Sequence, residues 1–294
     1  MRDGTQTASL SVNQSGAGHT VVKARRPRRL VVPHIVLILL VAATVYPLIF
    51  TLFGSIKSNA QFYTSFWAPT PPFHWENYAE AWETLRDGFV NSAIVSGITV
   101  AGVVFMSALS AWTFARYTFP GKEVAYYLIL ALMMLPFFLT MIPLYWIVKE
   151  LRLTGSLAAV FLPYLAGQAF AIFLMRGFFE NLPQDLFDSA RVDGAHELTV
   201  FFRIGLPLCL PIVVTVVILN IMGTWNDFFW PLLAVGLNQS AQTVMVRTYN
   251  LTGTVPEYGL QTAGYVLVSL PMVIMFLLGM RYYISGLTSG AIKL

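Results

Sequence analysis

The chain has 294 residues, of which 56% are hydrophobic and only 11% are charged, with a formal net charge of +4. Soluble domains carry about 25% charged residues, so this chain cannot cover a globular surface with charge. The composition excludes an ordinary soluble domain. It also excludes a nucleic-acid partner, because the basic residues are scattered between apolar runs instead of forming one patch.

The first 29 residues are basic and rich in Gly, Ser and Thr, and we expect them to form a disordered tail in the cytoplasm. The apolar run that follows, 30–53, is longer than the 7–15 residues typical of a cleaved signal core. The run therefore predicts a retained membrane span.

Six long stretches of the chain contain no Asp, Glu, Lys or Arg, and each can supply the ~20 apolar residues that a membrane-crossing helix needs. The uncharged stretch 228–246 turns polar halfway, so we do not expect it to be a seventh span. The sequence predicts an all-α integral membrane protein with six transmembrane helices in one domain, 30–294. The expected spans are about 30–53, 89–115, 124–148, 153–176, 204–234 and 259–282.

Basic residues set the expected topology. With the N-terminus in the cytoplasm, 13 of the 18 Lys and Arg residues fall on the inner side of the membrane. Cytoplasmic loops of membrane proteins carry such an excess of Lys and Arg. Both termini are therefore expected to be cytoplasmic.

The longest outer loop follows the first span. Within it, Glu76, Glu80, Glu83 and Asp87 recur at helical spacing. This pattern predicts a short amphipathic helix before the second span.

Motifs of catalysis and metal binding are missing from the sequence, including GxxxxGK[ST], HExxH and GxSxG. The four histidines, His19, His34, His74 and His196, are scattered, so we expect no metal site. The single cysteine, Cys209, is interpreted as a small buried apolar side chain. We expect a non-catalytic chain without a cofactor of its own.

A polar connector, 180–206, interrupts the apolar second half on the expected cytoplasmic side. Pro183 and Asp185 favour the start of a helix, and Gly194 permits a sharp turn. A second amphipathic piece runs on to Pro207. The sequence predicts two short helices around a hinge, and the alternative is an ordinary interfacial link between two spans.

Residues 188–207 resemble a cytoplasmic motif of ABC importer permeases, which reads E-A-A, three residues, G, nine residues and I-x-L-P. In this sequence the corresponding letters are DSA, RVD, G, nine residues and IGLP. Asp188 replaces the Glu of the motif and Ser189 replaces an Ala, which keeps the charge and the small size. ARVDGA is similar to the form usual in carbohydrate importers. FGSIKSNAQFY, MMLPFFLTMIPLY, GTWNDFFWPL and GLTSGAIKL also resemble the maltose-permease type of subunit, from about Leu30 to the end.

This resemblance implies the type I ABC importer permease fold and a permease subunit of an ATP-driven, binding-protein-dependent importer of mono- or oligosaccharides in the cell (inner) membrane. It implies four kinds of partner: a second homologous permease subunit, two cytoplasmic ATPase subunits that hold ATP and Mg, an extracytoplasmic sugar-binding protein, and the sugar. The C-terminal segment Ser289–Leu294 is a second candidate ATPase contact, with a solvated tail as the alternative. The residues expected to couple to the ATPase are Leu186, Asp188, Ser189, Ala190, Arg191, Asp193 and Gly194.

Polar side chains inside membrane spans are costly and often functional. Asn220, Trp225, Asn226 and Asp227 in the fifth expected span are therefore candidate substrate-path residues, because Asn can both donate to and accept from sugar hydroxyls. Alternatively, Trp225 belongs to an outer aromatic belt, Asn226 caps a helix break, and the main sugar contacts lie on the partner subunit.

Three other classes of protein are alternatives to this interpretation. An ABC permease for a non-sugar solute is the nearest. A secondary transporter usually has ionisable residues at mid-membrane, whereas these spans hold only Asp227, near an edge. A membrane-embedded enzyme would need converging acid, base or metal ligands, and the spans offer none.

Overall fold

The computed structural model describes residues 31–253 and 256–289, with side chains from 32 to 280 outside that gap. The described ranges contain helices and no strand, which confirms the predicted all-α fold. The expected N-terminal tail, 1–29, and residues 290–294 lie outside the described residues. In chain order the elements are α1 (Val31–Gly54), α2 (Asn59–Thr64), α3 (Glu76–Arg116), α4 (Lys122–Leu132), α5 (Phe137–Glu150), α6 (Leu157–Ala166), α7 (Ala169–Glu180), α8 (Asp185–Val192), α9 (Glu197–Val200), the π-helical turn η1 (Phe201–Gly205), α10 (Leu206–Leu208), α11 (Leu210–Asn226), α12 (Phe229–Val235), the 3-10 turn η2 (Gln239–Ala241), α13 (Val244–Asn250) and α14 (Tyr258–Ser289).

The chain divides into two compact units, residues 1–47 and residues 48–294. In the first unit the described part is the beginning of α1, an apolar helix without a charged residue. The end of α1 and all later elements belong to the second unit.

Three helices, α1, α3 and α14, are each long and apolar enough to cross a membrane. Three bent pairs pass the same test together: α4 with α5, α6 with α7, and the segment α9 to α10 with α11. Counting each bent pair as one span gives up to six spans, the number that the charge-free stretches predict.

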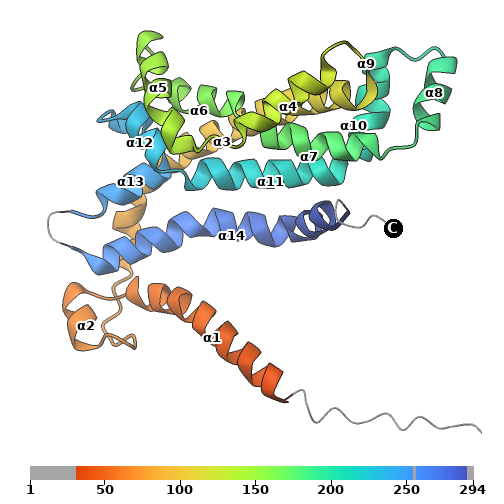
Figure 1. Cartoon of the computed structure of the whole chain (residues 1–294). Helices are drawn as coiled ribbons and strands as arrows, with labels where there is room; N and C mark the ends of the chain where they lie inside the picture. The colour runs from red at the N-terminus through yellow and green to blue at the C-terminus, as the bar shows by residue number, and fades with distance from the viewer. Residues whose placement is uncertain (1–30, 254–255, 290–294) are drawn as a thin grey trace, which may run out of the picture. The chain divides into compact units, whose positions relative to one another are not determined.

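The 41-residue helix α3 is central to the packing of the second unit and contacts α6, α7, α11, α13 and α14. Small residues on α3 let these neighbours approach closely, as is usual for helices that pack in lipid. At Gly102, for example, an added Cβ would lie 2.3 Å from Leu165 Cδ2 of α6. Figure 1 shows α7, α11 and α14 with roughly parallel axes, and α11 runs opposite in chain direction to the other two.

Three of the expected spans are interrupted, and proline explains two of the breaks. The third is split between α4 and α5 at a 98° bend, directly before α5, where Pro136 disfavours helical geometry in the residue before it. The fifth bends by 77° at Cys209, because Pro211 has no N–H to donate to the carbonyl of Pro207. The fourth bends by 43° between α6 and α7, beside Gly167.

The amphipathic helix expected around Glu76–Asp87 is present, but it is not a separate element. It forms the first turns of α3 and continues into the span without a break, because no proline intervenes. Its acidic residues are exposed, whereas Ala81 and Leu85 are fully buried. The amphipathic pattern is therefore right, and the expected end of the helix is wrong.

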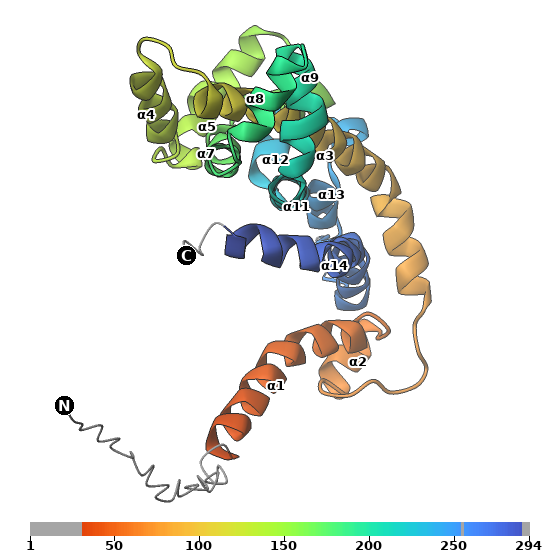
Figure 2. The ribbon, with the colours of Figure 1, turned by 90° about the vertical axis from the view of Figure 1, so that its right-hand side faces the viewer.

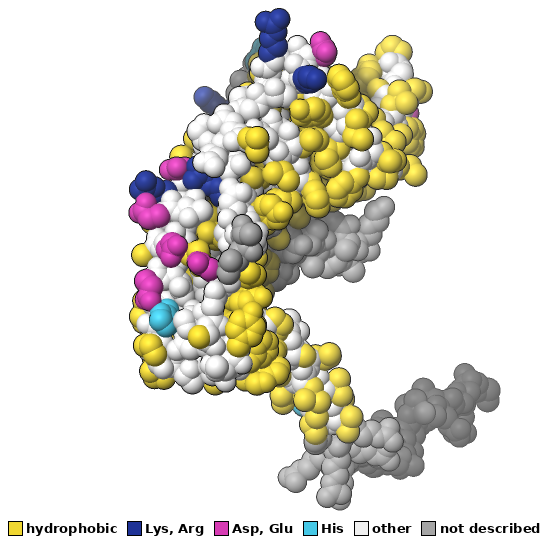
Figure 3. Space-filling model, turned by 90° about the vertical axis from the view of Figure 1, so that its left-hand side faces the viewer, with side chains coloured by type: hydrophobic (Ala, Val, Ile, Leu, Met, Phe, Trp, Pro, Cys, Tyr) yellow, Lys and Arg dark blue, Asp and Glu magenta, His cyan; other side chains and the backbone are white. Residues whose placement is uncertain are grey.

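The polar parts of the second unit lie at its two ends. Helices α8 and α9 lie at one end, which Figure 2 views directly, and α5, α12 and α13 lie at the other. Figure 3 views the latter end, where acidic and basic side chains gather along one flank while hydrophobic side chains cover much of the remaining face. This distribution suits a protein whose long sides face lipid.

The contact between Gly205 and Trp112 gives a test of this packing. A Cβ at Gly205 would lie 2.6 Å from Trp112 Cζ3, so Gly205→Ala should overpack the core at a cost of about 1–3 kcal/mol. We expect a thermal unfolding midpoint several degrees lower for the detergent-purified chain, followed by the reaction of the buried Cys209 thiol with a maleimide dye.

The matched control is Gly97→Ala in α3, where an added Cβ meets nothing within 4 Å. We expect this variant to unfold at or slightly above the wild-type temperature, because alanine favours a helix over glycine. Equal midpoints for the two variants would contradict the described packing of η1 on α3.

Candidate functional site

The predicted hinge of the connector is the end of helix α8. Gly194 has a φ of +80°, in the left-handed region that favours glycine. Its N–H donates to the carbonyl of Arg191 at 3.0 Å, and the N–H of Ala195 donates to the carbonyl of Ala190 at 2.9 Å. This pair of bonds is the usual way in which a left-handed residue stops a helix. Acidic residues in the first turn favour the other end of α8 through the helix dipole.

Helix α8 is attached to the protein through Phe187, which is fully buried. The ring of Phe187 packs edge-on against Trp112 of α3, with the ring centroids 5.2 Å apart and an interplanar angle of 80°. The Cζ atom of Arg116 lies 4.3 Å from the centroid of the Phe187 ring. Edge-to-face aromatic pairs and cation–π contacts each contribute roughly 0.5–1.5 kcal/mol beyond simple burial. One aromatic side chain therefore fixes α8 to the end of α3.

Arg116, the last residue of α3, also holds the segment that leads into α8. Its Nη1 donates to Gln184 Oε1 at 2.9 Å, and its Nη2 donates to the carbonyl of Leu182 at 2.9 Å and to that of Phe179. A guanidinium can do this because its five N–H donors form a rigid fork. The carbonyl groups at the end of α7 thereby gain partners that the helix itself cannot provide.

A second network ties α8 to α9. Arg191 Nε donates to Glu197 Oε1 at 2.9 Å, and Arg191 Nη1 donates to Asp188 Oδ1 at 3.1 Å. The Tyr117 hydroxyl donates to Glu197 Oε2 at 2.8 Å. The hydrogen bonds with Glu197 raise the pKa of the Arg191 guanidinium. Burial, followed by the hydrogen bond with Glu197, raises the pKa of the Tyr117 phenol. Both groups therefore remain protonated donors at neutral pH.

The face of α8 that points away from Phe187 is exposed. Leu186 is 43% exposed and Val192 is 87% exposed, and Ser189 and Asp193 are exposed beside them. With 3.6 residues per turn, these four residues share one side of the helix. A short helix that shows apolar and polar side chains on one face can bind in a groove of another protein. We call these four residues the outer face of α8.

The structure separates the seven expected coupling residues into two groups. Leu186, Ser189 and Asp193 lie on the outer face. The other four shape the connector itself: Asp188 and Arg191 through their ion pair, and Ala190 and Gly194 through the end of α8.

Sequence reasoning missed most of the residues that anchor the connector. The available signal was Phe187, an aromatic residue within a short polar stretch, whose partners come from distant parts of the chain. The missed residues are Trp112, Arg116, Tyr117, Gln184, Phe187 and Glu197.

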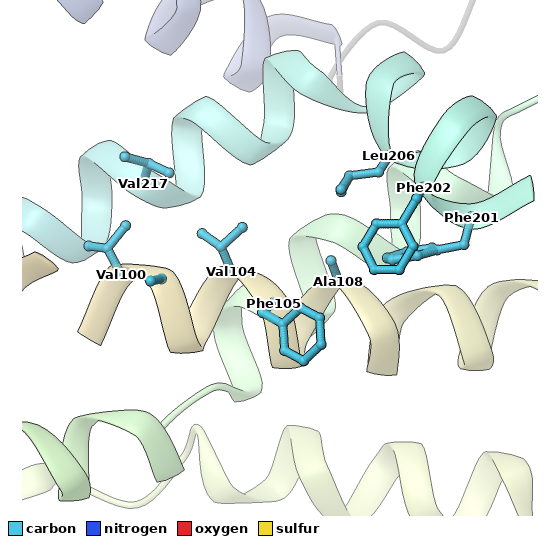
Figure 4. Close-up of a pocket in the computed structure, with 9 residues that line it drawn as sticks. Val100, Val104, Phe105, Ala108, Phe201, Phe202, Leu206 and Val217 are labelled. Atoms are coloured by element: carbon cyan, nitrogen blue, oxygen red, sulfur yellow. The ribbon is translucent and has the colours of Figure 1, made fainter. Parts of the chain in front are cut away.

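After α9, the helix does not end at Pro207 as expected but continues through η1 and α10 to Leu208. Figure 4 shows an apolar pocket beside η1 and α10, with Phe202 and Leu206 facing Val104 and Ala108 of α3. The pocket has a volume of about 250 Å³, and no polar or charged side chain lines it. It therefore cannot form hydrogen bonds with a hydroxylated ligand through side chains. The π-helical geometry of η1 is rare and often marks functional regions.

The four candidate substrate-path residues do not lie together. Asn220 and Asp227 line a cavity of about 500 Å³. Trp225 is buried against other helices, and its Nε1 donates to the carbonyl of Val268 at 3.3 Å. In this conformation the Trp225 side chain contacts other helices and does not line the cavity. Asn226 is exposed and does not line the cavity, and its Nδ2 donates to the carbonyl of Met222 at 2.9 Å.

Within the described parts of the chain, no group of three or more His, Cys, Asp or Glu residues could hold a metal ion. Cys209 is buried in the same apolar cluster as Trp112, Phe187 and Phe201. Its apolar neighbours indicate that Cys209 serves to pack this cluster.

Comparison with known proteins adds a family and a fold. Residues 104–289 match the family described as binding-protein-dependent transport system inner membrane component. The diacetylchitobiose uptake system permease protein NgcG of Streptomyces coelicolor is 30% identical over 271 residues, which cover 89% of this chain and 88% of that protein. The arabinooligosaccharides transport system permease protein AraQ of Bacillus subtilis is 34% identical over 205 residues, which cover 70% and 73%.

Among solved structures, a bacterial ABC transporter involved in the import of the acidic polysaccharide alginate contains a chain with the same fold. The TM-score is 0.74 at 21% sequence identity, and the match covers 86% of this chain and 95% of that chain. The expected ABC importer permease fold is thereby confirmed.

Replacing Phe187 tests how the connector is anchored. Phe187→Ala should cost about 3–5 kcal/mol of local packing, so α8 should open more often. Because proteolysis follows the population of the open form, trypsin should cleave after Arg191 at least tenfold faster than in the wild type. The control Leu186→Ala removes an exposed neighbour and should change this rate less than twofold. Similar rates for both variants would show that Phe187 does not hold α8.

Proposed function

The chain belongs to the family of inner membrane components of binding-protein-dependent transport systems, and on this basis we propose that it carries carbohydrate across the cell membrane for an ATP-driven importer. It is a membrane subunit of such a system and not an enzyme in its own right. In this proposal the transported substrate is a mono- or oligosaccharide, and the chain forms the translocation path together with a second permease subunit.

The names of the relatives support the choice of carbohydrate. The Streptomyces relative is named for diacetylchitobiose uptake and the Bacillus relative for the transport of arabinooligosaccharides. The ARVDGA form within the connector points to the same branch of importers. A non-sugar solute is the second candidate, because the fold itself does not select a substrate.

The single observation that carries the coupling proposal is the outer face of α8. This face is exposed, although the same helix is firmly held on its other side by Phe187. A rigid helix with an exposed face can bind a partner without losing further conformational entropy on binding. We infer that a cytoplasmic ATPase binds there through Leu186, Ser189, Val192 and Asp193.

Coupling then needs a differential interaction. A docked ATPase can shift the membrane domain between conformations only if it binds the connector more tightly in one conformation than in another. The ATPase subunits hold ATP and Mg in this proposal, since the sequence contains no phosphate-binding loop. The chain itself needs no cofactor.

The resemblance to ABC importer permeases implies the remaining members of the proposed assembly. Two ATPase subunits and a second permease subunit complete the membrane complex, and an extracytoplasmic protein delivers the sugar. The excess of Lys and Arg in the connector, the tails and the inner turns supports cytoplasmic N- and C-termini in the inner membrane.

A charge on the outer face of α8 should prevent the ATPase subunits from binding. Val192→Asp adds a carboxylate at a residue that is 87% exposed, so the fold should tolerate it. Burying the unpaired carboxylate in a partner groove is costly, and we expect the ATPase subunits to be lost on affinity purification. Uptake of labelled oligosaccharide into vesicles should fall to background.

The matched control is Leu237→Asp, which adds the same charge at a residue that is 97% exposed between α12 and η2. This variant should retain the ATPase subunits. Retention of the ATPase by Val192→Asp, with normal uptake, would refute docking on the outer face of α8.

A further inference from the structure

The cavity lined by Asn220 and Asp227 has the character of a ligand site. It lies between α5, the junction of α6 and α7, and the end of α11, and its volume is about 500 Å³. Most of its lining is apolar, but it includes the hydroxyl groups of Thr140 and Tyr164. Small-molecule sites commonly have volumes of about 300–1,000 Å³ and combine apolar walls with a few polar groups.

Two helix breaks meet at this cavity. Gly167 lines it at the bend between α6 and α7, and Asp227 lines it where α11 ends, before α12 begins at Phe229. Within a membrane, interrupted helices are tolerated mainly where they line a water-filled cavity or are buried in protein. Transporters use such breaks to build substrate sites.

The most polar group in the cavity is held in a fixed position. Asp227 Oδ2 accepts a hydrogen bond from the Tyr164 hydroxyl at 2.6 Å, and Asp227 Oδ1 accepts one from the N–H of Trp230 at 3.3 Å. An ionised carboxylate has about four acceptor positions, so these two bonds leave others for a ligand. The Tyr164 oxygen can likewise still accept a hydrogen bond.

The chemistry of the lining selects one class of ligand. Asp227 is negative, and no Lys, Arg or His lines the cavity, so an anionic sugar would meet an uncompensated like charge. A neutral sugar offers hydroxyl groups that can donate to the carboxylate and to the Asn220 oxygen. Phe137, which lines the cavity and is 41% exposed, offers an aromatic face for the apolar side of a sugar ring.

We propose that Tyr164 and Asp227 form a hydroxyl-binding pair that positions one neutral glycosyl unit of the substrate in this cavity during transport. This inference rests on the proposed function and adds a site and a charge class to it. Asn220 provides a third polar contact, and its own Nδ2 is already used by the carbonyl of Val216 at 2.9 Å.

The pair also connects two helices, so the test must separate recognition from structure. The complete importer, with its ATPase, second permease and binding protein, is reconstituted in liposomes. Diacetylchitobiose, arabinotriose and raffinose serve as probes, and the one taken up fastest by the wild type is then compared with its monodeoxy analogues. The variants are Asp227→Asn and Tyr164→Phe, and the control is Asn226→Ala, the neighbouring residue outside the cavity.

We expect the wild type to take up one deoxy analogue about tenfold or more slowly than the parent sugar, because a hydrogen bond to a charged group is lost. Asp227→Asn and Tyr164→Phe should slow uptake of the parent sugar and reduce this discrimination to less than threefold, whereas Asn226→Ala should preserve it. A purely structural pair would slow uptake of the parent sugar and of its analogues equally, so unchanged discrimination in the variants would overturn the inference.

The two proposals fail in different ways. If the wild type takes up none of the three probes, the carbohydrate function is overturned and this site with it. If the wild type takes up a probe and the variants discriminate as it does, only the role of Tyr164 and Asp227 is overturned.

Discussion

The contact between Arg116, Trp112 and Phe187 at the end of α3 is the interaction on which the connector depends. An eight-residue helix such as α8 is not stable by itself in water, so its shape must come from tertiary contacts. Phe187 supplies the buried side chain, and Arg116 binds both the ring and the carbonyl groups at the end of α7. The outer face of α8 is consequently available for a partner while the inner face is fixed.

Helix α3 is held in a comparable way within its N-terminal half. Asn91 Nδ2 donates to the carbonyls of Ser240 and Gln242 at 2.8 and 2.9 Å, and the N–H of Val244 donates to Ser92 Oγ at 2.9 Å. One continuous helix therefore joins the connector to the η2–α13 region. The three bent spans line the cavity around Asp227, whereas α3 is one unbroken helix. Such an arrangement suits a protein in which one rigid helix transmits a displacement while the bent helices change shape.

Much of the fold could be predicted from the sequence, because the absence of charge over some 20 residues is a direct consequence of burial in lipid. The hinge at Gly194 was also predictable, since a left-handed residue after a short helix favours glycine. The helix breaks at Pro136 and beside Pro211 were likewise predictable, because proline disrupts a helix. Pairings between distant residues were not accessible in this way. No local sequence pattern predicts the pairing of Tyr164 with Asp227 or of Arg116 with Gln184, because these residues meet only after the helices pack.

The distance between the connector and α3 in different nucleotide states tests the central claim most directly. Spin labels at residue 185 on α8, which is not one of the four outer-face residues, and residue 106 on α3, both exposed positions, would be introduced with the buried Cys209 replaced by serine. Electron–electron double resonance on the reconstituted importer should give the same mean distance without nucleotide and with ATP, because Phe187 and Arg116 make α8 move together with α3. A change of about 5 Å or more between the two states, the scale of a one-turn helix shift, would show that the connector moves independently of α3.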